Sequence, residues 1–205
     1  LERRLLKPVL GLFEKNLARL CLVGLGLFSS HSRRFLAKID SYDAWMELNE
    51  IGPGARVDLS TELSRHNFLP LISVVMPVYR PNHSHFIAAI KSIDQQIYSN
   101  WELCLCDDGN EDAVIQDELR RLSIQSSKTN LATHLRNQGI AAAMNSAAKL
   151  ARGEIMLFLD QDDLLAPDCL AEFALAFARG PDVDLVYSDS DKLDAQNRRT
   201  SPSFK

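Results

Sequence analysis

Short apolar runs alternate with longer amphipathic segments over residues 71–187, and this pattern dominates the chain. Apolar runs without polar alternation are typical of strands buried on both faces of a parallel sheet. We therefore expect five strands, at residues 71–78, 101–106, 128–135, 155–159 and 183–187. The run at 155–159 is the clearest, because it passes directly from solid apolar sequence into a group of acids.

The segments between these runs carry helix signals. Asn82 can cap a helix over 82–97, and Pro167 suits the first turn of a helix that ends near Arg179. Two further helices are expected at about 113–123 and 140–151; Gly139 opens the second, and Gly153 ends it in a left-handed conformation. Strands that alternate with helices predict an α/β fold with a mostly parallel sheet and right-handed crossovers.

Residues 1–69 differ in pattern and are expected to form a separate helical extension followed by a linker. A helix over 1–28 carries basic residues among leucines, so it either packs on the main domain or a partner, or lies on a membrane surface. A second short helix over 42–49 has Trp45 as its packing anchor. Gly and Pro at 51–54 break that helix, and residues 55–70 are expected to be the linker. The main domain then spans 70–205.

Composition narrows the possible functions. The 205 residues are 46% hydrophobic and 24% charged, which is ordinary for a globular protein. A net charge of -4 gives no general attraction to nucleic acid. The most apolar window, 20–28, is too short for the roughly 20 residues of a membrane-spanning helix. We therefore expect a cytoplasmic protein, with a peripheral membrane contact if the first helix lies on a membrane surface.

The four cysteines show no spacing typical of a zinc site. Cys104 and Cys106 lie two residues apart in an apolar run, so on a strand they share one face. Buried free thiols are expected, which favours a reducing compartment.

Acidic residues follow three of the five expected strands, at Asp107-Asp108, at 160–163, and at Asp189 and Asp191. In open α/β sheets, ligands bind at the carboxyl ends of the strands. Asp160 and Asp162 would point to the same side of an extended backbone. Mg²⁺ and Mn²⁺ prefer such oxygen ligands, and a metal there would stabilise charge on a departing diphosphate. The alternative is a solvated acidic loop or a helix-capping cluster.

Asp107-Asp108 has a second possible role. A carboxylate accepts hydrogen bonds, so it can recognise the imide N–H of uracil or thymine. The alternative is an Asx-type turn that closes the strand, followed by the turn Gly109-Asn110. No glycine-rich phosphate loop is present. His83, His85 and His134 have no partner at metal-ligand spacing and are expected to be surface or turn residues. No Ser-His-Asp or Cys-His arrangement is predicted.

Four segments together resemble the family 2 glycosyltransferases, in order and spacing: LISVVMPVY at 71–79, NWELCLCDDG at 100–109, NQGIAAAMN at 137–145 and GEIMLFLDQDDLLAP at 153–167. The resemblance covers about residues 70–205. It is closest to bacterial enzymes of polysaccharide and O-antigen assembly, which share a Tyr-x-x-Trp segment (Tyr42 to Trp45) and a Y-S-D-x-D-K segment (Tyr187 to Lys192).

The resemblance implies a Rossmann-like GT-A fold and inverting transfer of a sugar from a nucleotide-diphosphate donor to a hydroxyl. The donor is expected to be a UDP- or dTDP-sugar, and the acceptor a glycan or a lipid-linked molecule. The implied cofactor is Mg²⁺ or Mn²⁺. By carry-over, the donor-binding residues are Pro77 and Tyr79 at the base and ribose, Asp108 at the base with Asp107 beside it, Gly139 and Asn145 at the diphosphate, Asp160 near the ribose and Asp162 on the metal.

The sequence also departs from the family pattern. Met144 stands where many members have arginine, so a diphosphate contact would come from elsewhere, such as Arg136. The general base and the acceptor half are expected beyond Lys205, and Asp191 is a stand-in on chemistry alone. These residues therefore predict the donor-binding half of an enzyme. Two alternatives remain: a nucleotidyltransferase of similar fold, and a nucleotide-sugar-binding module without turnover.

Overall fold

The computed structural model describes residues 42, 46, 53–66, 69–180 and 182–203. They belong to two compact units. The larger unit is Ile51–Val186, and the smaller combines Leu1–Glu50 with Tyr187–Lys205.

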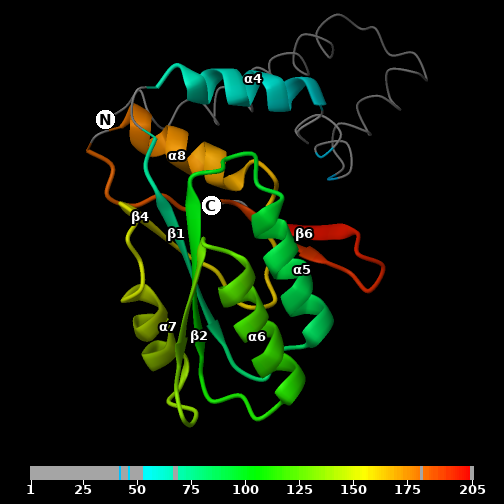
Figure 1. Cartoon of the computed structure of the whole chain (residues 1–205). Helices are drawn as coiled ribbons and strands as arrows, with labels where there is room; N and C mark the ends of the chain where they lie inside the picture. The colour runs from blue at the N-terminus through cyan, green and yellow to red at the C-terminus, as the bar shows by residue number, and fades with distance from the viewer. Residues whose placement is uncertain (1–41, 43–45, 47–52, 67–68, 181, 204–205) are drawn as a thin grey trace, which may run out of the picture. The chain divides into compact units, whose positions relative to one another are not determined.

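The larger unit is built on four parallel strands flanked by helices (Figure 1). The strands are β1 (Ile72–Val78), β2 (Trp101–Asp107), β3 (Thr129–Thr133) and β4 (Ile155–Phe158), in the sheet order β3-β2-β1-β4. The helices are α4 (Pro53–Ser64), α5 (His83–Asp94), α6 (Ala113–Gln125), α7 (Ile140–Ala148) and α8 (Cys169–Arg179). The predicted α/β fold is confirmed. Each end of the first four strands lies within two residues of its predicted position.

Local signals explain most helix boundaries. Asn82 caps α5 as predicted, because its side chain accepts hydrogen bonds from the backbone N–H groups of Ser84 and His85. Asp112 does the same for α6 through the N–H of Val114. Helix α5 ends three residues before the predicted Ile97, at Asp94.

The two faces of the sheet have separate apolar cores. Alternate residues of the central strands β1 and β2, such as Val74 and Leu103, face a large core completed by helices α4, α5, α6 and α8. The core on the opposite face is smaller: Val75, Cys104 and Cys106 pack there against α7. The prediction that the two strand cysteines share one buried face is confirmed. Burial raises the pKa of each thiol to about 11, so both stay protonated at neutral pH.

Strand β4 does not have two buried faces, so that prediction is wrong. Ile155 and Leu157 point into the large core, whereas Met156 and Phe158 are 49% and 61% exposed. The physical reason is position. Among the described strands, β4 lies at the edge and pairs only with β1, and α7 packs against β1, β2 and β3. A continuous apolar run therefore did not distinguish an edge strand from a central one.

The connections reverse direction at β1. The chain runs from β1 through α5 to β2 and through α6 to β3, and then crosses by α7 to β4 on the other side of β1. Helices α5 and α6 cover one face, and α7 covers the other (Figure 1). Such a reversal opens a crevice at the carboxyl ends of the two strands on either side of it, here β1 and β4.

Two predicted boundaries are wrong. The expected linker over 55–70 is mostly helix α4, and Pro53 occupies the first helical position, where a missing N–H costs nothing. Leu59 and Leu63, four residues apart, are buried in the large core.

Gly153 does not end α7, which stops at Ala148. Position 153 needs glycine for another reason: a Cβ atom on this residue would lie 2.4 Å from the carbonyl oxygen of Leu71.

The expected fifth parallel strand at 183–187 is also wrong. Its apolar Leu185 is 79% exposed, and among the described residues the run pairs with no other strand. The acids that follow it lie in the smaller unit, where β5 (Ser190–Leu193) pairs antiparallel with β6 (Arg199–Ser203). The carboxylate of Asp191 accepts hydrogen bonds from the Tyr42 hydroxyl and from Nε of Arg199.

The N-terminal predictions fall mostly outside the described residues. Tyr42 and Met46 are helical, as expected for the second short helix. Trp45 and the helix over 1–28 lie outside the described part. Within that part, no helix combines the length and the apolar character needed to cross a membrane.

A buried acid fixes the amino ends of the central strands. Both oxygens of Glu102 are used: they accept hydrogen bonds from Ser73 Oγ, Asn130 Nδ2, and the backbone and guanidinium of Arg152. Burial alone would raise the pKa of Glu102, but the bonds from Arg152 and Ser73 hold it below its usual value. The network joins β1, β2, β3 and the segment before β4 across one end of the sheet.

We predict that Glu102→Ala lowers the free energy of unfolding by about 3 kcal/mol, since it leaves a buried hydroxyl and a guanidinium without their acceptor. Glu102→Gln, which keeps one acceptor oxygen, should lose less. Because the folded pKa lies below the usual value of 4.5, the ionised carboxylate contributes stability above that pH and loses it as the pH falls. Denaturant unfolding at pH 7 and at pH 3 measures both effects. Equal midpoints for wild type and Glu102→Ala at pH 7 would contradict this role.

Candidate functional site

The carboxyl ends of β1, β2 and β4 carry the residues singled out in the sequence. Tyr79 follows β1, Asp107 ends β2 with Asp108 next to it, and Asp160 follows β4 after Leu159. Since all three strands are parallel and adjacent, these ends lie at one edge of the sheet. The edge coincides with the crevice expected where the chain reverses.

Gln161 joins the ends of β1 and β4. Its Oε1 accepts a hydrogen bond from Tyr79 N at 2.8 Å, and its Nε2 donates to Tyr79 O at 3.0 Å. This pair of bonds holds the backbone of Tyr79 beside the acidic segment. Sequence reasoning missed Gln161, because only the fold brings a residue between two aspartates opposite the end of β1.

The acidic segment forms a turn. The prediction that Asp160 and Asp162 point to the same side assumed an extended backbone, and that assumption is wrong. The N–H of Asp163 donates to the carbonyl of Asp160 at 3.2 Å. All three residues are largely exposed. Partial burial of the Asp163 carboxyl, and then the charges of Asp160 and Asp162, raise its pKa. A turn therefore gathers carboxylates that repel one another.

Such a turn suits a divalent cation, whose charge would relieve the repulsion. The described residues contain no group of three or more His, Cys, Asp or Glu side chains arranged to hold a metal by themselves. Mg²⁺ often takes one or two protein carboxylates and completes its shell with ligand phosphates and water. Asp160 and Asp162 fit a site of that incomplete kind.

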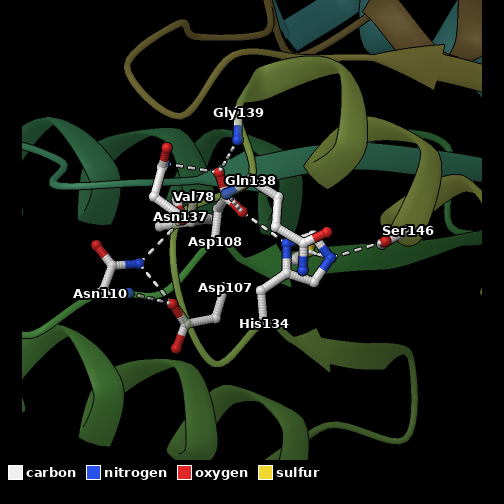
Figure 2. A network of polar contacts seen from close by, with 10 residues as sticks. Val78, Asp107, Asp108, Asn110, His134, Asn137, Gln138, Gly139 and Ser146 are labelled. Carbon is white, nitrogen blue, oxygen red and sulfur yellow. Dashed lines mark hydrogen bonds and ion pairs between the residues drawn. The ribbon is translucent and has the colours of Figure 1, made fainter.

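The end of β2 is closed by a turn around Asp107 and Asn110 (Figure 2). Oδ1 of Asp107 accepts from the backbone N–H of Asn110 at 2.9 Å and from its Nδ2 at 2.7 Å. Asn110 also donates to Val78 O and accepts from the N–H of Arg80. The turn that was the alternative explanation of the acidic pair is therefore present at Asp107. Sequence reasoning gave Asn110 no role beyond the turn, yet it ties β1 to β2.

Gly109 sits in this turn with a φ of 74°, a conformation that side chains disfavour. A Cβ atom here would also lie 2.5 Å from the carbonyl carbon of Arg136. The chain after β3 therefore passes directly over the turn after β2. The predicted turn at Gly109-Asn110 is confirmed.

Asp108 is enclosed by donors from the loop between β3 and α7. Its Oδ1 accepts from His134 Nδ1 at 2.6 Å and from Gln138 N at 2.9 Å; its Oδ2 accepts from Asn137 Nδ2 at 2.8 Å and from Gly139 N at 2.9 Å (Figure 2). Burial alone would raise the pKa of Asp108, but the bonds from His134, Gln138 and Gly139 hold it below its usual value. The carboxylate is therefore ionised and fully hydrogen-bonded.

His134 continues this network to helix α7. Its Nε2 lies 2.9 Å from Ser146 Oγ and 3.7 Å from Cys106 Sγ. The structure thus contains a Ser146-His134-Asp108 line that the sequence gave no reason to expect. Its members come from α7, the end of β3 and the end of β2, and no spacing in the chain signals that they meet.

The other predicted residues have the following positions. Pro77 is buried in β1 opposite Cys106, beyond the part of β1 that pairs with β4, so its missing N–H breaks no bond there. Gly139 is the N-cap of α7 with a φ of 91°. Asn145 is exposed on α7, and its side chain has no hydrogen bond to the described residues around Asp108 or Gln161.

Comparison with known proteins gives a family match. The model for "Glycosyl transferase family 2" matches residues 73–203. The O-antigen biosynthesis protein RfbC of Myxococcus xanthus is 35% identical over 165 residues, which are 80% of this chain and 13% of that protein. The UDP-Glc:alpha-D-GlcNAc-diphosphoundecaprenol beta-1,3-glucosyltransferase WfgD of Escherichia coli is 38% identical over 94 residues, 46% of this chain and 36% of that protein. The chain therefore spans only a part of these relatives.

Among solved structures, S. aureus TarS 1-349 in complex with UDP-GlcNAc is similar, with a TM-score of 0.47 and 23% identity. The match covers 53% of this chain and 31% of that chain.

We predict that Asp163→Asn raises the free energy of unfolding at pH 7, because it removes a charge that is partly buried and that Asp160 and Asp162 repel. A carboxyl whose folded pKa is raised destabilises the fold above its usual pKa, and this effect disappears as the pH falls below that value. The gap between variant and wild type should therefore close near pH 3. Unfolding by urea at both pH values checks this, and a variant less stable than wild type at pH 7 would refute the repulsion.

Proposed function

The chain belongs to glycosyl transferase family 2, and on this basis we propose that its larger unit binds the nucleotide-diphosphate sugar donor of a metal-dependent transferase. The observation that carries the proposal is the meeting of Tyr79, Asp107-Asp108 and the Asp160–Asp163 turn at one edge of a parallel sheet. Relatives named for O-antigen biosynthesis and glucosyl transfer support a role in polysaccharide synthesis.

The metal ion, Mg²⁺ or Mn²⁺, is assigned to the acidic turn. Asp162 is the proposed direct ligand, and Asp160 is placed nearer the ribose. When bound, the ion would offset the negative charge that develops on the departing nucleoside diphosphate. The chain's own contribution is to hold the two carboxylates beside Tyr79 through Gln161, so that ribose, diphosphate and metal share one location.

The base is assigned to the ends of β1 and β2. Pro77 and Tyr79 would line the base and ribose. The base contact expected of Asp108 passes to its neighbour Asp107, because four donors already fill the Asp108 carboxylate. Asp107 Oδ2 makes none of the protein hydrogen bonds that Oδ1 makes. No buried side-chain oxygen in the described residues lacks a partner, so Oδ2 reaches solvent. An accepting oxygen there supports a base with an imide N–H, as in a UDP- or dTDP-sugar.

The diphosphate is assigned to the start of α7, between Gly139 and Asn145. Helix α7 has no side-chain cap on its first turn, so backbone N–H groups there remain available to an anion. Arg136, exposed in the preceding loop, is the nearest candidate in sequence for a cationic contact.

The proposals for the acceptor and the reaction outcome rest on the family resemblance alone. We propose inverting transfer to a hydroxyl of a glycan or lipid-linked acceptor, in agreement with the diphosphoundecaprenol acceptor in the name of WfgD. No general base is assigned. The carboxylate of Asp191 is already engaged by Tyr42 and Arg199, which makes it a poor candidate. Contact of the first helix with a membrane surface stays a prediction.

We predict that UDP binds in the presence of Mn²⁺ and that affinity falls at least tenfold when the metal is omitted, since carboxylates and diphosphate repel each other without it. Isothermal titration calorimetry with UDP, dTDP and GDP measures this and the base preference. Asp162→Ala should abolish the metal effect, and Asp160→Ala should weaken binding further by loss of a ribose contact.

Asp117→Ala is the matched control, because Asp117 is an exposed acid on α6 that pairs with Arg120, away from the proposed site. It should bind like wild type. UDP affinity that is independent of Mn²⁺, or unchanged in Asp160→Ala/Asp162→Ala, would contradict the proposal.

A further inference from the structure

We propose that His134 is a positioning residue of the donor site: it holds the Asp108 carboxylate, and through it the loop 137–139 that leads into α7. This inference rests on the proposed function, because it assigns that loop to the nucleotide-diphosphate site. His134 itself need not touch the ligand.

The Asp108 carboxylate determines the shape of the loop. Two of its four donors are the consecutive backbone N–H groups of Gln138 and Gly139, and a third is the side chain of Asn137. These bonds fix the main chain immediately before α7, where Gly139 adopts a φ of 91°. Charge-assisted bonds of this kind are about twice as strong as neutral ones.

His134 supplies the fourth donor and connects the carboxylate to two other elements. The backbone N–H of His134 donates to Asp107 O at 2.8 Å, which fixes the residue at the end of β3. Its ring lies between Asp108 Oδ1 and Ser146 Oγ on α7, with a side-chain exposure of 11%. The imidazole therefore links the ends of β2 and β3 to the helix that the loop enters (Figure 2).

The direction of these bonds predicts one tautomer. An ionised carboxylate only accepts, so Nδ1 must carry a proton. In the neutral ring, Nε2 then accepts a hydrogen bond from the Ser146 hydroxyl. The two ring nitrogens therefore have different tasks: Nδ1 orients Asp108, and Nε2 orients the ring.

A nucleophilic Ser-His-Asp site is the less suitable explanation of the same line. Its carboxylate would serve the histidine, whereas Asp108 is shared with three further donors from the loop. The arrangement fits a carboxylate that organises a loop, with His134 completing its shell.

Two substitutions separate the tasks of the ring nitrogens. In His134→Asn the amide nitrogen can take the place of Nδ1, and in His134→Gln it takes the place of Nε2. We expect His134→Asn to keep the affinity for UDP with Mn²⁺ within about threefold of wild type. His134→Gln and His134→Ala should lose about tenfold, as expected for one lost bond to a charged group. Ser146→Ala should lose less than His134→Gln.

Amide hydrogen exchange provides a readout that does not need a ligand. The N–H groups of Gln138 and Gly139 should exchange slowly in wild type and in His134→Asn, and faster in His134→Gln, at matched unfolding midpoints. Nitrogen-15 spectra of the wild-type histidine side chains should show the Nδ1–H tautomer for His134. The nitrogen-15 spectra use only the wild-type protein, so they test the proposal even if a variant fails to fold.

Equal affinities for His134→Asn and His134→Gln, unchanged exchange at Gln138 and Gly139, or an Nε2–H tautomer would each overturn the positioning role. A wild-type chain that binds no nucleoside diphosphate with Mn²⁺ would instead refute the donor site. The exchange and tautomer data would then still decide whether His134 holds the loop.

Discussion

The pairing of β1 with β2 on one side and β4 on the other is the constraint on which the rest of the structure depends. It requires the chain to reverse direction, so α7 crosses the face opposite α5 and α6. It also brings the segments after three strands to one edge. Neither the acidic turn after β4 nor the Asn110 turn after β2 would lie near Tyr79 without that pairing.

Two sets of acids in the larger unit contrast electrostatically. Glu102 and Asp108 are buried, and donors fill both oxygens of each, so the pKa of each lies below its usual value. The Asp160–Asp163 turn is the opposite case, because its carboxylates are exposed and the pKa of Asp163 is raised. The first set stabilises the protein, one member at each end of the sheet. In the second set the charged form of Asp163 lowers stability, and a bound cation would offset that charge.

Much of the fold could be predicted from the sequence, because apolar runs, Asn82 and Gly139 are local signals. The failures have a shared cause. Whether β4 is central or at an edge, and whether 183–187 finds a strand to pair with, depends on partners that no local pattern contains. The helix α4 was mistaken for a linker, because Gly and Pro at its start outweighed the spacing of Leu59 and Leu63.

The candidate site divides in the same way. The aspartates were found because they follow strands. Gln161, His134 and Ser146 carry no such signal, and their roles appear only when the loops meet. The most direct test of the site is paramagnetic broadening by Mn²⁺ of backbone amide signals, with and without UDP. The predicted result is that UDP concentrates the broadening at Gln161–Asp163 and Gly139 and leaves the amides of α6 sharp. Broadening spread over surface acids such as Asp117, or unchanged by UDP, would contradict a shared metal and nucleotide site.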